Sequence, residues 1–399
     1  MRELPTYTPD FEEYIRQGEP GKKERAQIWR TAIGLQQGDG LETSDYLKQV
    51  ARKHIEGDIS LKEVKTLIDT YYQAEEVRKS PDVDEKREAD KVSERITDLL
   101  SQRTFTFNPT QLIAIHRYLF TGIYKFAGKI RDYNISKKEW VLRGESVYYS
   151  SCDLILDSLK YDIGQEKEFD YSSLALSDVI SHLSQFCSNI WQIHAFGEGN
   201  TRTTAVFMIK YLSTLGFEIT NDMFAENSWY FRNALVRANY RNVAEGVDYS
   251  PIYLERFFRN LLLGENNVLR NRELHLDWKT PTSTPTSTPS STPSSTPSST
   301  PTSLEEKQKK TSIGKNMIET DNENVIRFMR ALGHEQMSVK DLMAKVGLSD
   351  RKNFLEYSLN PAMDAGFVRM LYPESPKHPR QKYLLTVKGL CWYNNDLCK

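Results

Sequence analysis

The sequence predicts a mostly α-helical protein: a helical bundle that carries one short β-hairpin, followed by a small α+β domain. Apolar residues recur at helical spacing over long stretches before Thr280. One stretch in that part, 134–151, is β-prone on both sides of a turn. A run of Thr, Ser and Pro over Thr280–Ser303 then separates the bundle from a remainder with its own pattern of helices and strands.

Three helices are expected in the bundle. The clearest spans Leu176–Ile193, where apolar residues lie three and four positions apart. A second is expected over Thr203–Leu215, which Gly216 can end, and a third over Gln111–Tyr124. Between the third and the first, residues 143–145 divide two short β-prone runs, which predicts the hairpin.

Another pair of helices is expected upstream, over Ser44–Tyr72, divided near Gly57. Ser60 is the expected N-cap of the second helix of this pair. Glu63, three residues later, completes a capping box in which each residue bonds the backbone N–H of the other.

Composition excludes several classes of protein. The chain has 399 residues, of which 39% are hydrophobic and 27% charged, and its formal net charge is −1. This composition is ordinary for a globular protein, and the chain is long enough for two or three domains. With a net charge so close to zero, no overall electrostatic field attracts the chain to nucleic acid or to a membrane. The sequence shows no signal peptide and no apolar run of the roughly 18 residues that a membrane span needs. The four cysteines have the spacing of neither a zinc site nor a disulfide framework, so reduced thiols and a cytoplasmic protein are expected.

The Thr/Ser/Pro run is expected to be a solvated, semi-stiff linker, because it has no large apolar residue and its prolines favour polyproline II. A glycosylated stalk is the alternative, and it requires secretion. Four segments follow: a helical N-terminal extension (1–95), a catalytic domain (96–278), the linker (279–311) and a C-terminal domain (312–399).

The most informative stretch is the loop His194–Arg202, HAFGEGNTR, which lies between two of the expected helices. Its two glycines let the backbone turn sharply and bring several N–H groups to one side. The loop then opens the next helix, and a helix N-terminus with free N–H groups is suited to phosphates. Arg202 adds a planar charged fork for phosphate oxygens, and Phe196 is the expected apolar anchor.

Two side chains of this loop predict chemistry beyond anion binding. Glu198 would repel bound phosphates unless a cation bridges the two, and Mg²⁺ held by one carboxylate and phosphate oxygens is the usual solution. His194 ends the preceding helix, and an imidazole can accept a hydroxyl proton near neutral pH. A lone His at a helix end is more often structural, but this combination within nine residues predicts an active site.

The loop resembles the signature of the Fic family of protein AMP-transferases, H-P-F-x-[D/E]-G-N-G-R-x-x-R. Ile115–Lys137 is similar to the segment ahead of the family's hairpin flap, and Tyr240–Phe258 is similar to the helices that close its active site. The likeness covers roughly residues 100–265.

This resemblance implies a Fic-like helical bundle with a flap and assigns roles to single residues. His194 would be the general base that deprotonates a hydroxyl of the target protein, and Glu198 would hold Mg²⁺ on the α- and β-phosphates of ATP. The residues that would bind ATP and its phosphates are Phe196, Gly197, Glu198, Gly199, Asn200, Thr201 and Arg202. The flap would pair with an extended target segment through Lys138, Glu139, Trp140, Val141, Leu142, Val147, Tyr148 and Tyr149.

The loop departs from the family signature at three positions. Ala195 replaces its Pro, Thr201 replaces its second Gly, and Ala205 replaces its second Arg, which in the family reaches the outer phosphates of ATP. Fic proteins are often inhibited by a helix with the motif Ser/Thr-x-x-x-Glu-Gly/Asn, whose Glu pairs with that Arg. The extension contains no full copy of this motif, although residues 32–47 are similar to antitoxin-like segments fused to some Fic domains. We therefore expect modest ATP affinity and an extension whose removal changes the transfer rate only a few-fold.

The C-terminal segment, Asn322–Thr386, resembles a winged helix. A short helix opens at Ser338 and ends near Gly347, a second helix follows, and two strands then flank a basic, Pro-rich tip. The candidate contacts to DNA phosphates at this tip are Lys377, His378, Arg380 and Lys382. A winged helix that binds protein is the alternative.

The sequence thus predicts a protein adenylyltransferase that transfers AMP from ATP to a Ser, Thr or Tyr hydroxyl of a target protein, including itself. Two alternatives stay open: a DNA-binding transcriptional regulator whose Fic-like domain senses nucleotide, and phosphoryl transfer, as in Doc-like relatives. The expected cofactor is Mg²⁺, with ATP as substrate. The expected partners are the target protein and DNA, with no membrane, and a homodimer is left open.

Overall fold

A computed structural model describes residues 11–219, 222–278 and 318–397, and over these residues the protein is mostly α-helical, as the sequence predicts. The expected linker Thr280–Ser303 lies outside the described residues.

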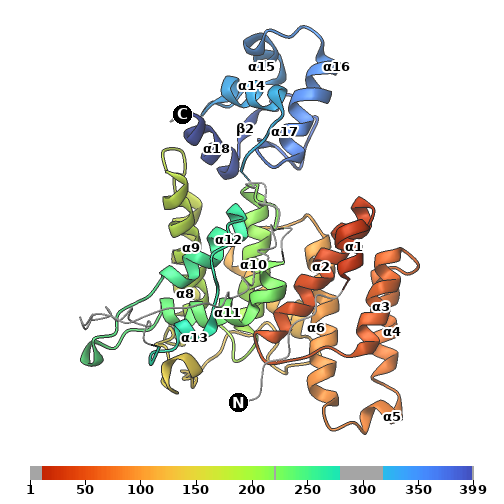
Figure 1. The fold of residues 1–399 in the computed structure, drawn as a ribbon, viewed down its shortest axis with the longest axis vertical. Helices are drawn as coiled ribbons and strands as arrows, with labels where there is room; N and C mark the ends of the chain where they lie inside the picture. The colour runs from red at the N-terminus through yellow and green to blue at the C-terminus, as the bar shows by residue number, and fades with distance from the viewer. Residues whose placement is uncertain (1–10, 220–221, 279–317, 398–399) are drawn as a thin grey trace, which may run out of the picture.

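Three groups of elements follow one another along the chain (Figure 1). The N-terminal group consists of α1 (Glu12–Gln17), α2 (Pro20–Gln37), α3 (Asp45–Glu56), α4 (Leu61–Tyr71), α5 (Glu75–Arg78) and α6 (Val83–Ser101). The central group consists of α7 (Pro109–Phe120), η1 (Trp140–Leu142), α8 (Ile155–Glu168), α9 (Leu176–Ile193), α10 (Asn200–Thr214), α11 (Met223–Ala238), η2 (Val243–Glu245), α12 (Ile252–Leu263) and α13 (Asn271–Leu274). The C-terminal group consists of α14 (Glu323–Leu332), α15 (Val339–Val346), α16 (Arg351–Phe354), η3 (Leu355–Leu359), α17 (Asn360–Asp364), β1 (Val368–Met370), β2 (Tyr383–Leu385) and α18 (Val387–Leu397).

Helices α9 and α10 form the centre of the bundle and carry the predicted loop between them. α9 has the predicted bounds, and the apolar face that the sequence predicts is buried. α10 begins at Asn200, before the predicted Thr203, because Gly199 takes the left-handed conformation with φ of 77° and starts the helix directly after the loop. Every residue from Asn200 to Leu212 is buried, so neighbouring elements surround α10.

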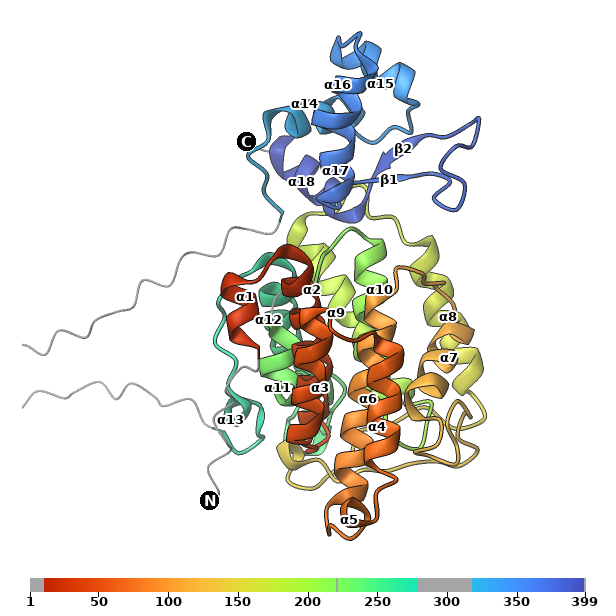
Figure 2. The ribbon, with the colours of Figure 1, turned by 90° about the vertical axis from the view of Figure 1, so that its right-hand side faces the viewer.

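The N-terminal helices pack onto the bundle through α2. The Ser228 hydroxyl of α11 donates to the Gly34 carbonyl of α2 at 2.7 Å. Arg30 of α2 is buried and lies 2.7 Å from an oxygen of Asp222. Helices α3 and α4 form a layer beside α2 and α6 (Figure 2).

The predicted capping box at the start of α4 is confirmed. The Ser60 N–H donates to Glu63 Oε2 at 2.7 Å, and the Glu63 N–H donates to Ser60 Oγ at 3.4 Å. The predicted division of this segment at Gly57 is also correct, since α3 ends there with φ of 92°.

The segment predicted as a β-hairpin in the bundle reverses direction without forming strands. Trp140–Leu142 is a single 3₁₀ turn, and the Glu139 N–H donates to the Glu145 carbonyl at 2.9 Å to close a compact loop. The two aliphatic residues of the turn are buried. The prediction of strands is therefore wrong here, because these β-prone residues pack into the core instead of pairing.

The C-terminal group has the predicted order of helices and strands. α15 ends at Gly347 as predicted. Helices α16 and α17 are joined by the π-helical turn η3, and Pro361, which has no N–H to donate, is the second residue of α17. β1 and β2 pair antiparallel, with Val368 opposite Leu385.

The C-terminal group docks on the end of α10 (Figure 1). Gly216 and Gly366 meet so closely that a Cβ on Gly216 would lie 2.0 Å from the Gly366 carbonyl oxygen. The Lys388 N–H donates to the Leu215 carbonyl at 3.1 Å. Contact between backbones therefore holds this group against the bundle.

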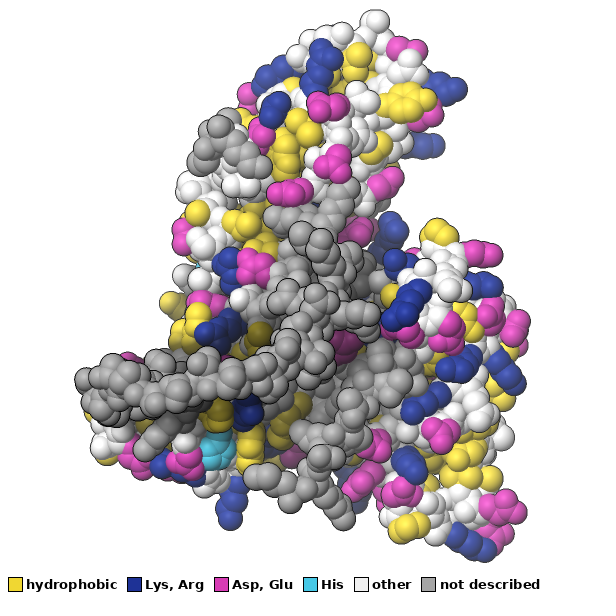
Figure 3. Space-filling view, viewed as in Figure 1, with side chains coloured by type: hydrophobic (Ala, Val, Ile, Leu, Met, Phe, Trp, Pro, Cys, Tyr) yellow, Lys and Arg dark blue, Asp and Glu magenta, His cyan; other side chains and the backbone are white. Residues whose placement is uncertain are grey.

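No helix among the described residues is long and apolar enough to cross a membrane. Figure 3 shows Lys and Arg side chains interspersed with Asp and Glu over the visible part of one face, in keeping with the formal net charge of −1.

Candidate active site

His194 lies at the C-terminal end of α9, where the chain turns into the loop. Its φ of 49° and ψ of 57° place it in the left-handed region, which non-glycine residues adopt infrequently. Such a conformation persists only where the surrounding structure enforces it, and it is often found at active sites.

Arg131 holds His194 in this left-handed conformation through hydrogen bonds to the backbone of the loop and its neighbours. Its Nε donates to the His194 carbonyl at 2.7 Å, while Nη1 donates to the Tyr133 carbonyl at 2.6 Å and Nη2 to the Ser150 carbonyl at 2.5 Å. Its own N–H donates to the Ala195 carbonyl at 3.0 Å. One guanidinium thus joins the loop to the segments before and after the flap. Sequence analysis missed Arg131, because no spacing pattern marks a side chain that binds distant carbonyls.

The imidazole of His194 is buried and neutral. The residue is 3% exposed, and neither ring nitrogen has a hydrogen-bond partner among the residues that the structure describes. Burial lowers the pKa of His194 well below its ordinary value, and the charges of Lys137 and Arg131 lower it further. Tyr149 packs on the imidazole with ring centroids 4.1 Å apart. A neutral imidazole without a partner can accept a proton, as the predicted base must.

Phe196 and Asn200 fix the shape of the loop. The Phe196 N–H donates to Asn200 Oδ1 at 3.0 Å, and Asn200 Nδ2 donates to the Phe196 carbonyl at 2.7 Å. The ring of Phe196 stacks on His116 with centroids 3.7 Å apart, and His116 Nε2 lies 3.0 Å from the Glu198 carbonyl. Phe196 is therefore a buried anchor, as the sequence predicts.

A cavity of about 520 Å³ lies between the loop, the flap and the N-terminal group. The start of α10 opens into it. Thr203 is the first residue of α10 whose N–H bonds within the helix, to the Gly199 carbonyl at 3.0 Å, so the N–H groups before it have no helical acceptor. His194 lines the same cavity, together with the predicted phosphate-binding residues Glu198, Gly199, Asn200, Thr201 and Arg202. The other two, Phe196 and Gly197, shape the loop without lining the cavity.

Arg202 is buried, and its guanidinium is already engaged. Its Nε lies 2.6 Å from Asp39 Oδ2, and its other nitrogens donate to Glu88 Oε1 at 2.7 Å and to Gln36 Oε1 at 3.0 Å. These partners come from α2, the loop after it and α6, which sequence analysis does not connect with the site. A contact from Arg202 to phosphate therefore requires exchange with Asp39, whose side chain is 24% exposed.

Glu198 carries a carboxylate that is 57% exposed and paired with Lys137, whose Nζ lies 2.9 Å from both oxygens. No group of three His, Cys, Asp or Glu residues in the described part of the chain could hold a metal by itself. A metal in this cavity would take one ligand from the protein and the others from phosphate and water. Glu198 fits that donor set, which Mg²⁺ commonly adopts.

The predicted flap residues differ in where their side chains lie. Lys138, Glu139 and Trp140 line the cavity, and Glu139 is buried against Arg232, with an oxygen 2.7 Å from Nη1. Tyr148 is exposed. The aliphatic flap residues are buried in the core: Val141, Leu142 and Val147. Their side chains anchor the flap to the bundle, so any contact of these three residues with a target would be made by their backbone, and the predicted pairing stays a prediction.

The predicted DNA contacts lie on a projecting hairpin of the C-terminal group (Figure 2). Lys377 and Arg380 are exposed in the loop between the two strands, and Lys382 is exposed directly before β2. His378 instead packs on Tyr372, with ring centroids 4.2 Å apart.

Comparison with known proteins places this geometry in a family. The model of the Fic/DOC family matches residues 106–212, which include the whole loop at His194. A second model, described as filamentation induced by cAMP protein Fic-like, C-terminal domain, matches residues 323–386. Among solved structures, the chain is similar to the crystal structure of a Fic family protein from Desulfovibrio desulfuricans G20, at 15% identity and a TM-score of 0.38 over 96% of this chain and 97% of that one. No curated protein matches the chain.

Members of the Fic family are typically transferases of nucleotidyl or phosphoryl groups. The loop at His194 falls within one match to this family, and the C-terminal group up to the start of α18 falls within the other. The chain is therefore a Fic domain protein, and the loop at His194 lies within its Fic domain.

Proposed function

We propose that the chain is a protein adenylyltransferase that moves AMP from ATP to a Ser, Thr or Tyr hydroxyl of a target protein, including its own. One observation carries the proposal: His194, neutral and without a hydrogen-bond partner in the described part of the chain, shares a cavity with the open N-terminus of α10. The imidazole supplies a proton acceptor. The helix end supplies N–H groups and positive potential for phosphates. A volume of about 520 Å³ also lies in the range of small-molecule sites.

In this proposal His194 accepts the proton of the target hydroxyl as its oxygen attacks the α-phosphorus of ATP. A bond forms between that oxygen and the phosphorus. The bond from the phosphorus to the oxygen that bridges to the β-phosphate breaks, and pyrophosphate leaves. The N–H groups at the start of α10 stabilise the charge that develops on the phosphate oxygens.

The buried imidazole of the free protein is a weak base, because its pKa is low. The negative charge of a nucleotide beside it opposes this shift and raises the pKa toward the range of an effective base. Substrate binding would thus activate the residue that acts on the target.

Mg²⁺ is the proposed cofactor, and Glu198 would hold it. When bound, the ion would neutralise negative charge on the phosphates. Glu198 would then exchange its contact with Lys137 for the metal, which frees the Lys137 ammonium to contact a phosphate oxygen.

The test uses the full chain with Mg²⁺ and ATP labelled at either the α- or the γ-phosphate, with mass spectrometry to locate any label on protein. We expect transfer of the α-label as AMP to a hydroxyl side chain. Transfer of the γ-label alone would support the alternative of phosphoryl transfer. ATP binding without transfer, to itself or to proteins of a lysate, would support a nucleotide-sensing domain.

The base role has its own test. His194→Ala should lower the transfer rate at least about a hundredfold, because a positioned base is lost. ATP binding, measured by calorimetry, should be retained, because the start of α10 holds the phosphates. His334→Ala, at an exposed histidine of the C-terminal group, is the matched control and should leave the rate unchanged. Equal rates for His194→Ala and the wild type would reject the assignment.

A second function is proposed for the C-terminal group: binding of duplex DNA. It is favoured by the exposed Lys377, Arg380 and Lys382 of a projecting hairpin, since side chains so placed can reach phosphates of a DNA backbone.

A further inference from the structure

We propose that a second cavity beside the active site binds a Lys- or Arg-containing segment of the target protein. Its role in target selection rests on the proposed function, although the binding itself requires no transfer. The cavity has a volume of about 520 Å³ and lies between α8, α9 and the end of the flap. We call it the target groove, after the lining residues that carry the argument: Tyr148, Asp157, Tyr161, Asp162 and Gln192.

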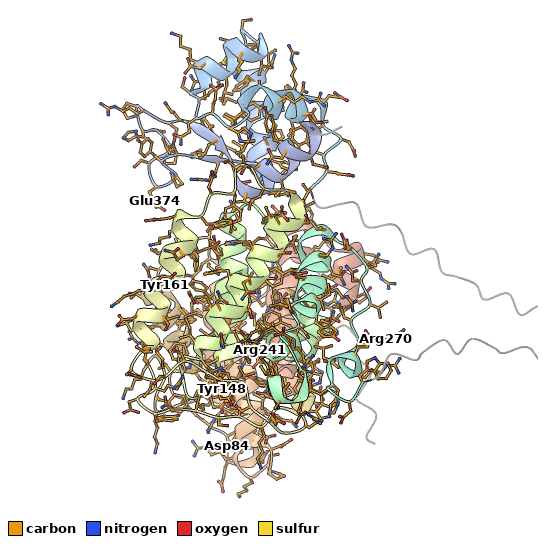
Figure 4. All side chains as sticks on the ribbon, turned by 90° about the vertical axis from the view of Figure 1, so that its left-hand side faces the viewer. Asp84, Tyr148, Tyr161, Arg241, Arg270 and Glu374 are labelled. Atoms are coloured by element: carbon orange, nitrogen blue, oxygen red, sulfur yellow. The ribbon has the colours of Figure 1, made fainter. Side chains whose placement is uncertain are left out.

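Two tyrosines present their rings in the target groove. Tyr148 is 83% exposed and Tyr161 is 67% exposed, the first at the end of the flap and the second on α8 (Figure 4). Within the described residues, neither ring packs on another aromatic ring or under a cation. Aromatic faces of this kind attract the guanidinium of Arg or the ammonium of Lys.

The charge of the target groove is negative. Its charged lining residues are Asp157 and Asp162, and no Lys or Arg from the described part of the chain lines it. Asp157 is exposed and lies 3.2 Å from Lys160. Asp162 is half-buried and has no hydrogen-bond or ion-pair partner among the residues described, and burial raises its pKa. A carboxylate that has lost part of its hydration without gaining a counter-charge gains most from a cation that a partner delivers.

The target groove adjoins the active site. Ile193, directly before His194, lines it, and so does Tyr149, which packs on the His194 ring. Gln192 Nε2 donates to the Tyr148 carbonyl at 3.1 Å, which fixes the end of the flap against α9. A polypeptide whose hydroxyl reaches His194 can therefore lay its neighbouring residues in the groove. The groove would then select targets with a basic residue close to the modified hydroxyl.

The experiment measures peptide binding to the full chain by fluorescence anisotropy, without ATP. One labelled probe carries a single Ser flanked by Arg and Lys, and the other has Glu in place of each basic residue. We expect the basic peptide to bind and the acidic peptide not to bind. The double variant Tyr161→Ala/Asp162→Asn should bind the basic peptide roughly tenfold more weakly, since it removes one cation–π interaction and one ion pair.

The matched control is Glu356→Gln/Tyr357→Ala, which removes the same charge and ring from an exposed pair in the C-terminal group and should leave binding unchanged. Thermal unfolding followed by circular dichroism should show both double variants folded, because the rings removed are exposed and the amides replace carboxyls of equal size.

Four results would overturn the proposal: no binding of the basic peptide to the wild type, equal binding of the acidic peptide, equal losses in the groove and control variants, or a wild-type dimer in sedimentation that only the groove variant dissociates. The last would assign the groove to a second copy of the chain. Because the assay contains no ATP, these results leave the proposed transfer standing. Peptide binding without any transfer from labelled ATP would instead reject the proposed function alone.

Discussion

Burial moves the side chains of His194 and Glu94 toward their neutral forms. For His194 the result is a proton acceptor held without a hydrogen-bond partner in the described structure, at a backbone conformation that Arg131 enforces. For Glu94, on α6, burial raises the pKa to about 7, and no hydrogen bond or ion pair to the described residues offsets the cost. The first shift bears on the proposed chemistry, whereas the second makes stability depend on pH.

Glu94→Gln is expected to stabilise the protein at high pH. The folded-state pKa of about 7 lies above the ordinary value of 4.5, so the contribution of Glu94 to stability is complete below pH 4.5 and is lost as the pH rises to 7. A neutral amide avoids that loss, so the variant should gain up to about 3 kcal/mol in free energy of unfolding at pH 8 and almost nothing at pH 4.5. Urea denaturation at both pH values measures the difference. Glu85→Gln, at an exposed position of the same helix, should show no such dependence, and a constant difference for Glu94→Gln would contradict the argument.

At the scale of elements, the position that holds the second Arg of the family signature is Ala205, on α10, and its surroundings decide whether an Arg there could reach ATP. Ala205 is fully buried and is not among the residues that line the cavity. Ala205→Arg is therefore expected to destabilise the protein by about 3–5 kcal/mol, as an unpaired charge does in a core, and not to improve ATP binding. Urea denaturation and calorimetry with ATP test both parts.

Ser213→Arg, at an exposed position of the same helix, controls for the added charge and should be tolerated. A stable Ala205→Arg variant with tighter ATP binding would show that the position reaches the phosphates after all.

The hairpin between β1 and β2 is the element on which DNA binding depends. Replacing Lys377, Arg380 and Lys382 by Gln should weaken binding of the full chain to duplex DNA. It should also reduce the slope of log K against log salt by about 2–3, because each basic side chain that neutralises a phosphate releases counterions. Gel-shift titrations over a salt series measure both quantities.

The control for this hairpin variant removes the same charge elsewhere, with Lys53, Lys62 and Lys65 of α3 and α4 changed to Gln. If it lowers affinity as much as the hairpin variant does, the hairpin does not bind DNA. Absence of any binding by the wild type at low salt would favour a protein-binding domain.

Elements with strong local patterns were predictable from the sequence, and contacts between distant segments were not. The bounds of α9 and the capping box at Ser60 follow from residues within a few positions of one another. The flap was mispredicted because the β-prone residues Val141 and Val147 are equally suited to a buried core, and only tertiary packing decides between the two. In the site, the sequence identifies His194 and the start of α10, while Asp39 reaches Arg202 only once the fold brings α2 beside the loop.

At the scale of the whole molecule, the N-terminal group lines the cavity of the candidate active site. Asp39 pairs with Arg202 and places negative charge at the cavity, so in the proposed function it would compete with phosphate for Arg202. Asp39→Asn should therefore strengthen ATP binding by roughly fivefold, which corresponds to about 1 kcal/mol for a partly exposed charge. Calorimetry in the His194→Ala background prevents turnover during the measurement.

Asp58→Asn, an exposed change of the same charge in the same group, should have no effect on that affinity. Weaker ATP binding by Asp39→Asn would mean that Asp39 instead holds Arg202 in the orientation that phosphate needs. Removal of residues 1–95 does not replace this test. The deletion would remove α2 and expose apolar residues of the bundle that α2 now buries. A loss of activity in that variant would therefore reflect unfolding.

The contact between Gly216 and Gly366 has a consequence for genetics. α10 begins at the loop that carries His194 and ends beside this contact, so the candidate active site and the docking of the C-terminal group lie at opposite ends of one helix. An alanine at Gly366 would need its methyl group 2.3 Å from the Gly216 carbonyl oxygen, with φ of 74°, so it must push the two backbones apart. Such a change would be a separation-of-function allele: one that releases the C-terminal group while leaving the residues around His194 in place. A phenotype of that allele would identify the processes that require the C-terminal group to stay docked on the bundle that carries His194.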